Sequence, residues 1–119
     1  MAEHNELGEI GEALAVEYLE KKGYKILAKN YTFGKAEVDI IAQIGDLLVA
    51  VEVKTRSSID FGLPQEAVKQ KKIQLLVSAV NEYVVSNELE LEVRFDIIAV
   101  HKNRGKYDLE HLENAFYHF

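Results

Sequence analysis

Residues 37–54, EVDIIAQIGDLLVAVEVK, contain two runs rich in Val, Ile and Leu that are separated by Gly45 and Asp46. Two such runs joined by a short loop with Gly in its first position are typical of a β-hairpin. If these two residues form the loop, Asp39 in the first strand faces Glu52 in the second. A three-residue loop with a bulge would instead shift the pairing by one residue.

This register gives the hairpin two different faces, because successive side chains on a strand alternate. One face has only apolar side chains: Val38, Ile40, Ala42, Ile44, Leu47, Val49, Val51 and Val53. The other face is apolar near the loop and charged at its far end: Glu37, Asp39, Ile41, Gln43, Leu48, Ala50, Glu52 and Lys54. Such a hairpin is expected inside a sheet that is covered on both sides, with the charged residues at the rim of a core.

Asp39 and Glu52 present an electrostatic conflict, because directly opposed residues have Cβ atoms roughly 5 Å apart. Two like charges at that distance repel by about 3 kcal/mol at an effective dielectric constant of about 20. A bound divalent cation would remove the conflict, since hard cations such as Mg²⁺ take carboxylate oxygens. Ion pairs with Lys54 and Arg56, together with solvent at the strand end, are the alternative. The hairpin alone leaves both solutions open.

The composition indicates a globular protein. With 119 residues the chain is long enough for one hydrophobic core, so we expect a single domain over residues 1–119. Its 48% hydrophobic and 29% charged residues are typical of folded proteins, and the absence of cysteine excludes disulfides, a thiolate nucleophile and Cys-based zinc sites. The net charge of -6 argues against broad non-specific binding to nucleic acid, although a local basic patch can override this average.

Several other kinds of site and segment are absent from the sequence. There is no secretory signal pattern at the N-terminus and no apolar segment of membrane-spanning length, so we expect a cytoplasmic protein with no membrane partner. The histidines lack metal-ligand spacing, and neither a glycine-rich phosphate loop nor a serine-nucleophile elbow is present. We expect Asp96 to have a structural role beside Arg94 or Arg56.

The remaining elements are predicted from hydrophobic periodicity and turn residues. In chain order they are a helix over about 5–22, a strand over 24–31, the hairpin, a helix over 65–85, a strand over 89–100 and a short strand or helix within 106–119. Asn5 and Gly23 are the expected cap and stop of the first helix, and Pro64 suits the first turn of the second. The strand–helix–strand crossover favours parallel pairing of the two strands that it joins.

The first helix has Glu12 at the margin of its apolar face. An ordinary boundary glutamate is one interpretation, and a carboxylate aimed at the same site as Asp39 and Glu52 is the other. Gly8 and Gly11 lie on the apolar side of this helix, where the missing side chains would allow close approach of another backbone.

The densest basic group in the sequence, Lys69, Lys71 and Lys72, lies in the first turns of the second helix. These lysines follow the charged end of the hairpin, as does Arg56 in the polar loop. All four are therefore candidates for contacts with the phosphates of a nucleic acid. A solvated helix face and a simple connecting loop are the alternatives.

The order helix, three strands, helix and strand, with Asp39 on one strand and Glu52-Val53-Lys54 on the next, resembles the PD-(D/E)xK nuclease superfamily. More closely, the chain resembles the bacterial YraN-like family, itself similar to archaeal Holliday-junction resolvases. The resemblance covers nearly the whole chain through ordered segments: GEIGEA at 8–13, NY at 30–31, EVDIIA at 37–42, VEVKTR at 51–56, FGLPQEAV at 61–68 and RFD at 94–96. This series is much more specific than the bare Asp…Glu-x-Lys pattern.

The resemblance implies an α/β protein with a restriction-endonuclease-like core (αβββαβ), in which helices flank a central mixed β-sheet. It also implies that Asp39 and Glu52 bind Mg²⁺, with Mn²⁺ as a substitute, helped by the carbonyl of Val53. Glu12 would complete the metal site. Lys54 would orient or deprotonate the attacking water and balance the charge on the phosphate.

The implied activity is metal-dependent hydrolysis of phosphodiester bonds in DNA by an endonuclease, with branched or damaged DNA as candidate substrates. A non-catalytic protein of DNA maintenance, which keeps the nuclease fold to bind nucleic acid or a partner protein, is the alternative. Junction-cleaving relatives act on substrates with two-fold symmetry, so a homodimer is expected.

Overall fold

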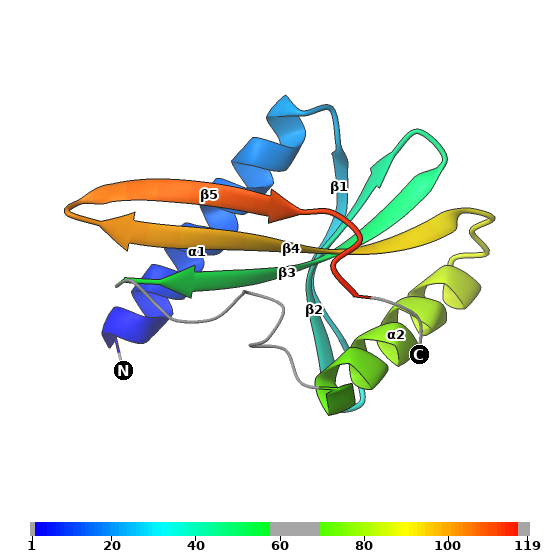
Figure 1. Ribbon diagram of the computed structural model, residues 1–119. Coiled ribbons are helices and arrows are strands. Elements are labelled where there is room, and N and C mark those ends of the chain that lie inside the picture. The colour runs from blue at the N-terminus through cyan, green and yellow to red at the C-terminus, as the bar shows by residue number, and fades with distance from the viewer. Residues whose placement is uncertain (1, 58–69, 117–119) are drawn as a thin grey trace.

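A five-stranded sheet lies between two helices in the computed structural model, which describes residues 2–57 and 70–116 (Figure 1). The elements are α1 (Ala2–Lys21), β1 (Lys25–Phe33), β2 (Ala36–Ile44), β3 (Leu47–Arg56), α2 (Gln70–Ser86), β4 (Glu92–Asn103) and β5 (Lys106–Leu112). The strands are arranged in sequence order across the sheet. Strands β3 and β4 are parallel and the other neighbours are antiparallel, which confirms the expected α/β architecture with a mixed sheet.

The hairpin of β2 and β3 has the predicted loop and register. Gly45 has a φ of 56°, which is available to glycine without steric cost, and the strands pair from Ile44 with Leu47 to Ile40 with Val51. Beyond Ile40 the paired ladder with β3 ends, whereas β2 continues to pair with β1 back to Ala36. The first residues of β2 therefore leave β3 and lie beside the first turns of α2 (Figure 1).

The two helices cover opposite faces of the sheet. In β3, Val49 and Val51 pack in a cluster with residues of α1, and the alternate residues Leu48 and Ala50 pack in a cluster with residues of α2. We refer to these faces as the α1 side and the α2 side. The hairpin is thus buried on both faces, as its apolar pattern predicts.

One part of the predicted face assignment is wrong. Val38 was expected to share a face with Ile40, but Val38 packs in the cluster of α2 and Ile40 in the cluster of α1. The strict alternation of side chains assumes a regular strand. The interruption lies where β2 leaves β3 and where Asn30, in the facing stretch of β1, has a φ of 52°.

The first helix begins earlier than predicted, so Asn5 lies inside α1 and is not its cap. Its end agrees with the prediction: Gly23 has a φ of 97°, and the N–H of Tyr24 donates to the Leu19 carbonyl at 2.9 Å. This is the Schellman pattern of helix termination. A Cβ added at Gly11 would collide with the side chain of Thr55 in β3, so close approach occurs there, but to a side chain and not to the expected backbone.

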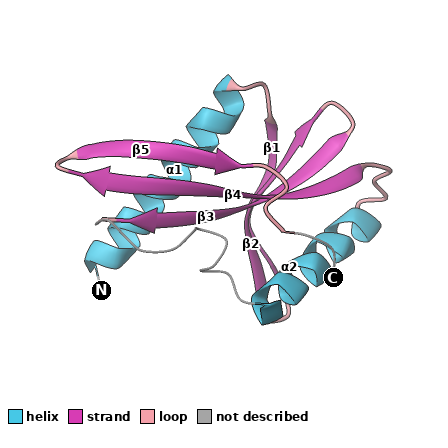
Figure 2. Cartoon of the chain, viewed as in Figure 1, coloured by secondary structure: helices cyan, strands magenta, loops and turns pink. Residues whose placement is uncertain are grey.

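The same prediction is wrong for Gly8, because a Cβ at that position would meet no atom of the described residues within 4 Å. In the second helix, Leu76 and Ala79 are buried in the core. Strand β4 begins at Glu92, later than the predicted residue 89, and the C-terminal segment forms β5. Strands β4 and β5 extend past the end of β3 as a hairpin (Figure 2).

The predicted start of the second helix, with Pro64, Val68 and Lys69, lies outside the described residues. Neither α1 nor α2 combines the length and the apolar composition that crossing a membrane requires, so the described part of the chain offers no such helix.

Candidate functional site

The divergence of β2 from β3 creates the candidate site. At the point where the backbone ladder stops, the N–H of Val53 donates to Oδ2 of Asp39 at 2.8 Å. The carboxylate of Asp39 thus takes the place of the next backbone carbonyl and satisfies a donor of β3 that the ladder leaves free. This bond fixes the Asp39 side chain against the strand that carries Glu52.

Glu52 lies on the α2 side of β3 and is only 3% exposed. Its Oε2 atom forms ion pairs with the ammonium groups of Lys54, at 3.6 Å, and of Lys72 in α2. Its Oε1 atom is buried and has no hydrogen-bond partner among the described residues. A buried carboxylate oxygen without a partner is costly, so this atom indicates a missing donor or cation.

The two carboxylates affect one another strongly. Burial and then the negative charge of Glu52 raise the pKa of Asp39 to about 7, although the hydrogen bond from the Val53 N–H acts to lower it. Protonated Asp39 can also donate a hydrogen bond to Glu52. The pair can therefore exist with a shared proton near neutral pH, or with both groups ionised around a cation.

Glu12 of α1 lies at the edge of this charged region. Its pKa is raised, first by burial and then by the charges of Glu37 and Glu52, against a hydrogen bond with Asn30 that lowers it. No three carboxylate or imidazole groups within residues 2–57 and 70–116 are arranged as a metal site. The structure therefore brings together Asp39, Glu52 and Lys54, and it leaves Glu12 nearby without placing it in the same cluster.

The site fits Mg²⁺ on the chemistry of its donors. This ion is commonly held by one or two carboxylates and completes its shell with water and substrate phosphate. Asp39 and Glu52 supply two carboxylates, and the Oε1 atom of Glu52 has no hydrogen-bond partner among the residues that the structure describes. The Val53 carbonyl, the expected backbone ligand, belongs to the residue that follows Glu52 and whose N–H holds Asp39.

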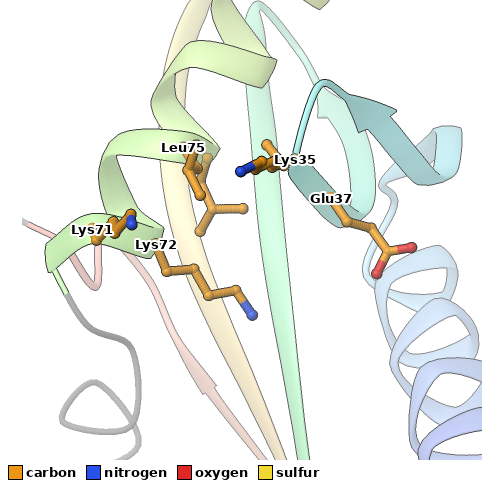
Figure 3. A pocket seen from close by; sticks show the side chains of 7 residues that line it. Lys35, Glu37, Lys71, Lys72 and Leu75 are labelled. Carbon is orange, nitrogen blue, oxygen red and sulfur yellow. The ribbon is translucent and has the colours of Figure 1, made fainter.

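Glu37 does not take its predicted place on the face of Lys54. Its carboxylate points toward α1 and away from the lysines of α2 (Figure 3), and its charge acts on Glu12. The same interruption of the alternation in β2 places Val38 on the α2 side.

The basic residues predicted to contact phosphate do not form a single group in the structure. Lys72 is paired with Glu52, and Lys71 is exposed at the rim of a pocket that also contains Lys35. Arg56 is the last residue of β3. The sequence analysis did not single out Lys35. Its position in the turn directly before the strand of Asp39 could have indicated it.

A second buried carboxylate, Asp96, has a full set of partners. Arg94 donates to both of its oxygens at 2.8 Å, the N–H of Asn114 donates to Oδ1 at 3.0 Å, and His111 Nε2 lies 2.7 Å from Oδ2. Burial acts to raise the pKa of Asp96, but the hydrogen bonds from His111 and Arg94 outweigh it and lower the pKa. His111 Nδ1 also lies 3.0 Å from the Tyr18 hydroxyl of α1.

These contacts confirm the predicted pairing of Asp96 with Arg94. The contribution of His111 was missed because nothing in the sequence indicates that β5 would place this residue beside β4.

Comparison with known proteins identifies the family. Residues 11–100 match the uncharacterised protein family UPF0102. The chain belongs to this family. A UPF0102 protein of Flavobacterium psychrophilum is 69% identical over 119 residues, covering 100% of both chains. The UPF0102 protein of Phocaeicola vulgatus is 44% identical over 117 residues, covering 98% of this chain and 97% of its own.

A UPF0102 protein of Alkaliphilus oremlandii is 47% identical over 116 residues, covering 95% of this chain and 99% of its own. The resemblance to the YraN-like family is therefore confirmed, since this family and UPF0102 are the same. The relationship of UPF0102 to the PD-(D/E)xK nucleases stays a prediction.

Proposed function

We propose that this UPF0102 protein is a Mg²⁺-dependent endonuclease that hydrolyses phosphodiester bonds in DNA. The supporting observation is the buried Oε1 atom of Glu52, which has no hydrogen-bond partner in the described structure and belongs to a carboxylate that interacts with Asp39. Asp39, Glu52 and the Val53 carbonyl would hold the ion, with Glu12 completing its surroundings. A bound divalent ion supplies a more acidic water molecule and neutralises phosphate charge.

The protein itself would position the reacting groups. The Val53 N–H holds Asp39 in place, so this carboxylate needs no reorganisation to bind a cation. The ammonium of Lys54 lies 3.6 Å from Glu52 Oε2, at the edge of the carboxylate pair. From there Lys54 can hold the attacking water or a phosphate oxygen once another cation balances Glu52.

A non-catalytic role in binding nucleic acid or a partner protein is the second candidate. The ion pair between Lys72 and Glu52 favours it, because Lys72 already neutralises the carboxylate that an enzyme would use for its metal. The net charge of -6 also suits a narrow range of nucleic-acid partners better than a broad one.

Cleavage assays discriminate between the two candidates. Supercoiled, linear and four-way-junction DNA are incubated with the protein and Mg²⁺ or Mn²⁺, beside the Asp39→Ala and Lys54→Ala variants. We expect metal-dependent nicking by the wild-type protein and none by either variant, with thermal unfolding used to verify that both variants fold. Absence of cleavage on every substrate, or cleavage that survives both substitutions, would contradict the enzyme proposal.

We propose further that the protein acts in the cytoplasm and that it binds branched DNA as a homodimer. The dimer is proposed because two copies related by a two-fold axis match a substrate of that symmetry. Sedimentation of the protein alone and with a four-way junction tests this proposal. A single copy bound per junction would contradict it.

A further inference from the structure

A pocket of about 480 Å³ lies between the first residues of β2 and the first turns of α2. It is lined by Lys35, Ala36, Glu37, Lys71, Lys72, Leu75 and Leu76. Lys72 belongs both to this pocket and to the carboxylate cluster, because its ammonium pairs with Glu52. The pocket is therefore directly adjacent to the candidate site, and its volume lies within the usual range for small-ligand sites.

The walls of the pocket have two different chemical characters. Ala36, Leu75 and Leu76 supply apolar surface, and the lysines supply positive charge. The ammonium of Lys35 points across the pocket toward Leu75, whereas the carboxylate of Glu37 points out toward α1 (Figure 3). Within the described part of the chain, neither Lys35 nor Lys71 has an ion-pair partner.

A ligand that suits both characters has an anionic group next to a flat or apolar body. Phosphate satisfies the lysines as an acceptor of charge-assisted hydrogen bonds. A sugar or base satisfies the leucines, since an unstacked base can pack against apolar side chains. A nucleotide has both parts.

We propose that the pocket holds one unpaired nucleotide of a bound DNA strand, next to the phosphate at the carboxylate cluster. Its phosphate lies between Lys35 and Lys71, and its base lies against Leu75 and Ala36. The placement of this nucleotide next to the cleaved bond rests on the proposed nuclease function. The binding of the nucleotide in the pocket does not. A base that enters this pocket has left the stack of a duplex, so the substrate class is DNA with an unpaired nucleotide beside the site.

Fluorescence anisotropy tests the proposal. A labelled single-stranded oligonucleotide and a fully paired duplex of the same length are titrated with the protein in EDTA, so that no cleavage occurs. The double variant Lys35→Gln/Lys71→Gln is compared with Lys21→Gln/Lys25→Gln, which removes equal charge from exposed lysines at the end of α1 and the start of β1. Thermal unfolding verifies that both variants fold.

We expect the pocket variant to weaken single-strand binding by about ten-fold, and the slope of log affinity against log salt to fall by about 1.4, or about 0.7 for each lost contact. The matched variant should change affinity by less than about two-fold. Equal effects of the two variants, or an equal loss for duplex and single strand, would overturn the proposal. Displacement of the oligonucleotide by micromolar mononucleotide would also overturn it, because the ligand would then be a free nucleotide.

The outcome is independent of cleavage. Loss of single-strand binding in the pocket variant of a protein that never cuts DNA would support the pocket and reject the nuclease. Cleavage by a protein whose single-strand binding survives the double substitution would support the nuclease and reject the pocket.

Discussion

Glu52 and Asp96 are buried carboxylates at neighbouring positions of adjacent strands, and the protein surrounds them in opposite ways. Glu52 is paired in register with Ile97, the residue after Asp96, and it faces the α2 side. Asp96 contacts residues on the α1 side and receives donors on both oxygens. Burial alone therefore does not distinguish the two groups. The difference is the Oε1 atom of Glu52, which no donor reaches in the described structure.

The largest expected effect comes from removing the satisfied carboxylate. Asp96→Ala leaves Arg94 partly buried with only its longer ion pair to the exposed Glu113, and it removes the carboxylate that pairs with His111 and the Asn114 N–H. Loss of one member of such a pair costs about 3–5 kcal/mol in the free energy of unfolding. Urea unfolding measures this loss.

Two control variants make the comparison quantitative. Asp108→Ala, at an exposed acid of β5, should change stability by less than about 0.5 kcal/mol. Glu52→Gln relieves repulsion with Asp39 while weakening the pair with Lys72, so we expect a loss of less than about 1 kcal/mol. A loss in the free energy of unfolding for Glu52→Gln as large as that for Asp96→Ala would contradict the difference between the two sites.

A smaller effect is expected where α1 contacts the strand of Glu52. Gly11→Ala places a methyl group against Thr55, and overpacking of this kind costs about 1–3 kcal/mol. Gly8→Ala is the matched variant in the same helix. Its new methyl meets no atom within 4 Å in the part of the chain that the structure describes, and replacing a helical glycine by alanine stabilises by about 0.5–1 kcal/mol. Thermal or urea unfolding that shows the same sign for both variants would contradict the close approach of α1 to β3.

A dependence of stability on pH is also expected. The pKa of Asp39 is about 7 in the folded protein against an ordinary value of 3.8, so the folded state holds its proton more tightly. This contribution is complete below the ordinary value and is lost as the pH rises through about 7. The lowered pKa of Asp96 acts in the opposite sense and only toward acid pH. In EDTA we therefore expect the Tm to fall between pH 5 and pH 8, because the raised pKa of Asp39 stabilises the folded state only while Asp39 is protonated.

Asp39→Asn removes the titrating group and should flatten this part of the Tm profile. A profile of the wild-type protein that rises from pH 5 to pH 8, or a variant profile identical to it, would show that Asp39 does not hold a proton in the folded state.

The sequence predicted most of the sheet, because its information is local and repetitive. The alternation of residues in the hairpin and the Gly45-Asp46 loop determine the register, and that register is observed. The crossover through α2 predicted the parallel pairing of β3 and β4. Asp39, Glu52 and Lys54 followed from this register, and the structure brings all three together.

The remaining features depend on packing between distant segments. Periodicity does not reveal where a ladder stops, so the bond from the Val53 N–H to Asp39 and the altered directions of Val38 and Glu37 were not predicted. The pairing of Lys72 with Glu52 depends on how α2 lies against β2 and β3.

The central claim is that Asp39 and Glu52 form a site for a divalent cation, and calorimetric titration of the metal-free protein with Mn²⁺ tests it most directly. We expect one Mn²⁺ per chain, bound more tightly at pH 8 than at pH 6 because Asp39 must lose its proton. Binding should disappear in Asp39→Asn and in Glu52→Gln and persist in Asp108→Asn. No binding by the wild-type protein at millimolar Mn²⁺, or unchanged binding in both site variants, would contradict the claim.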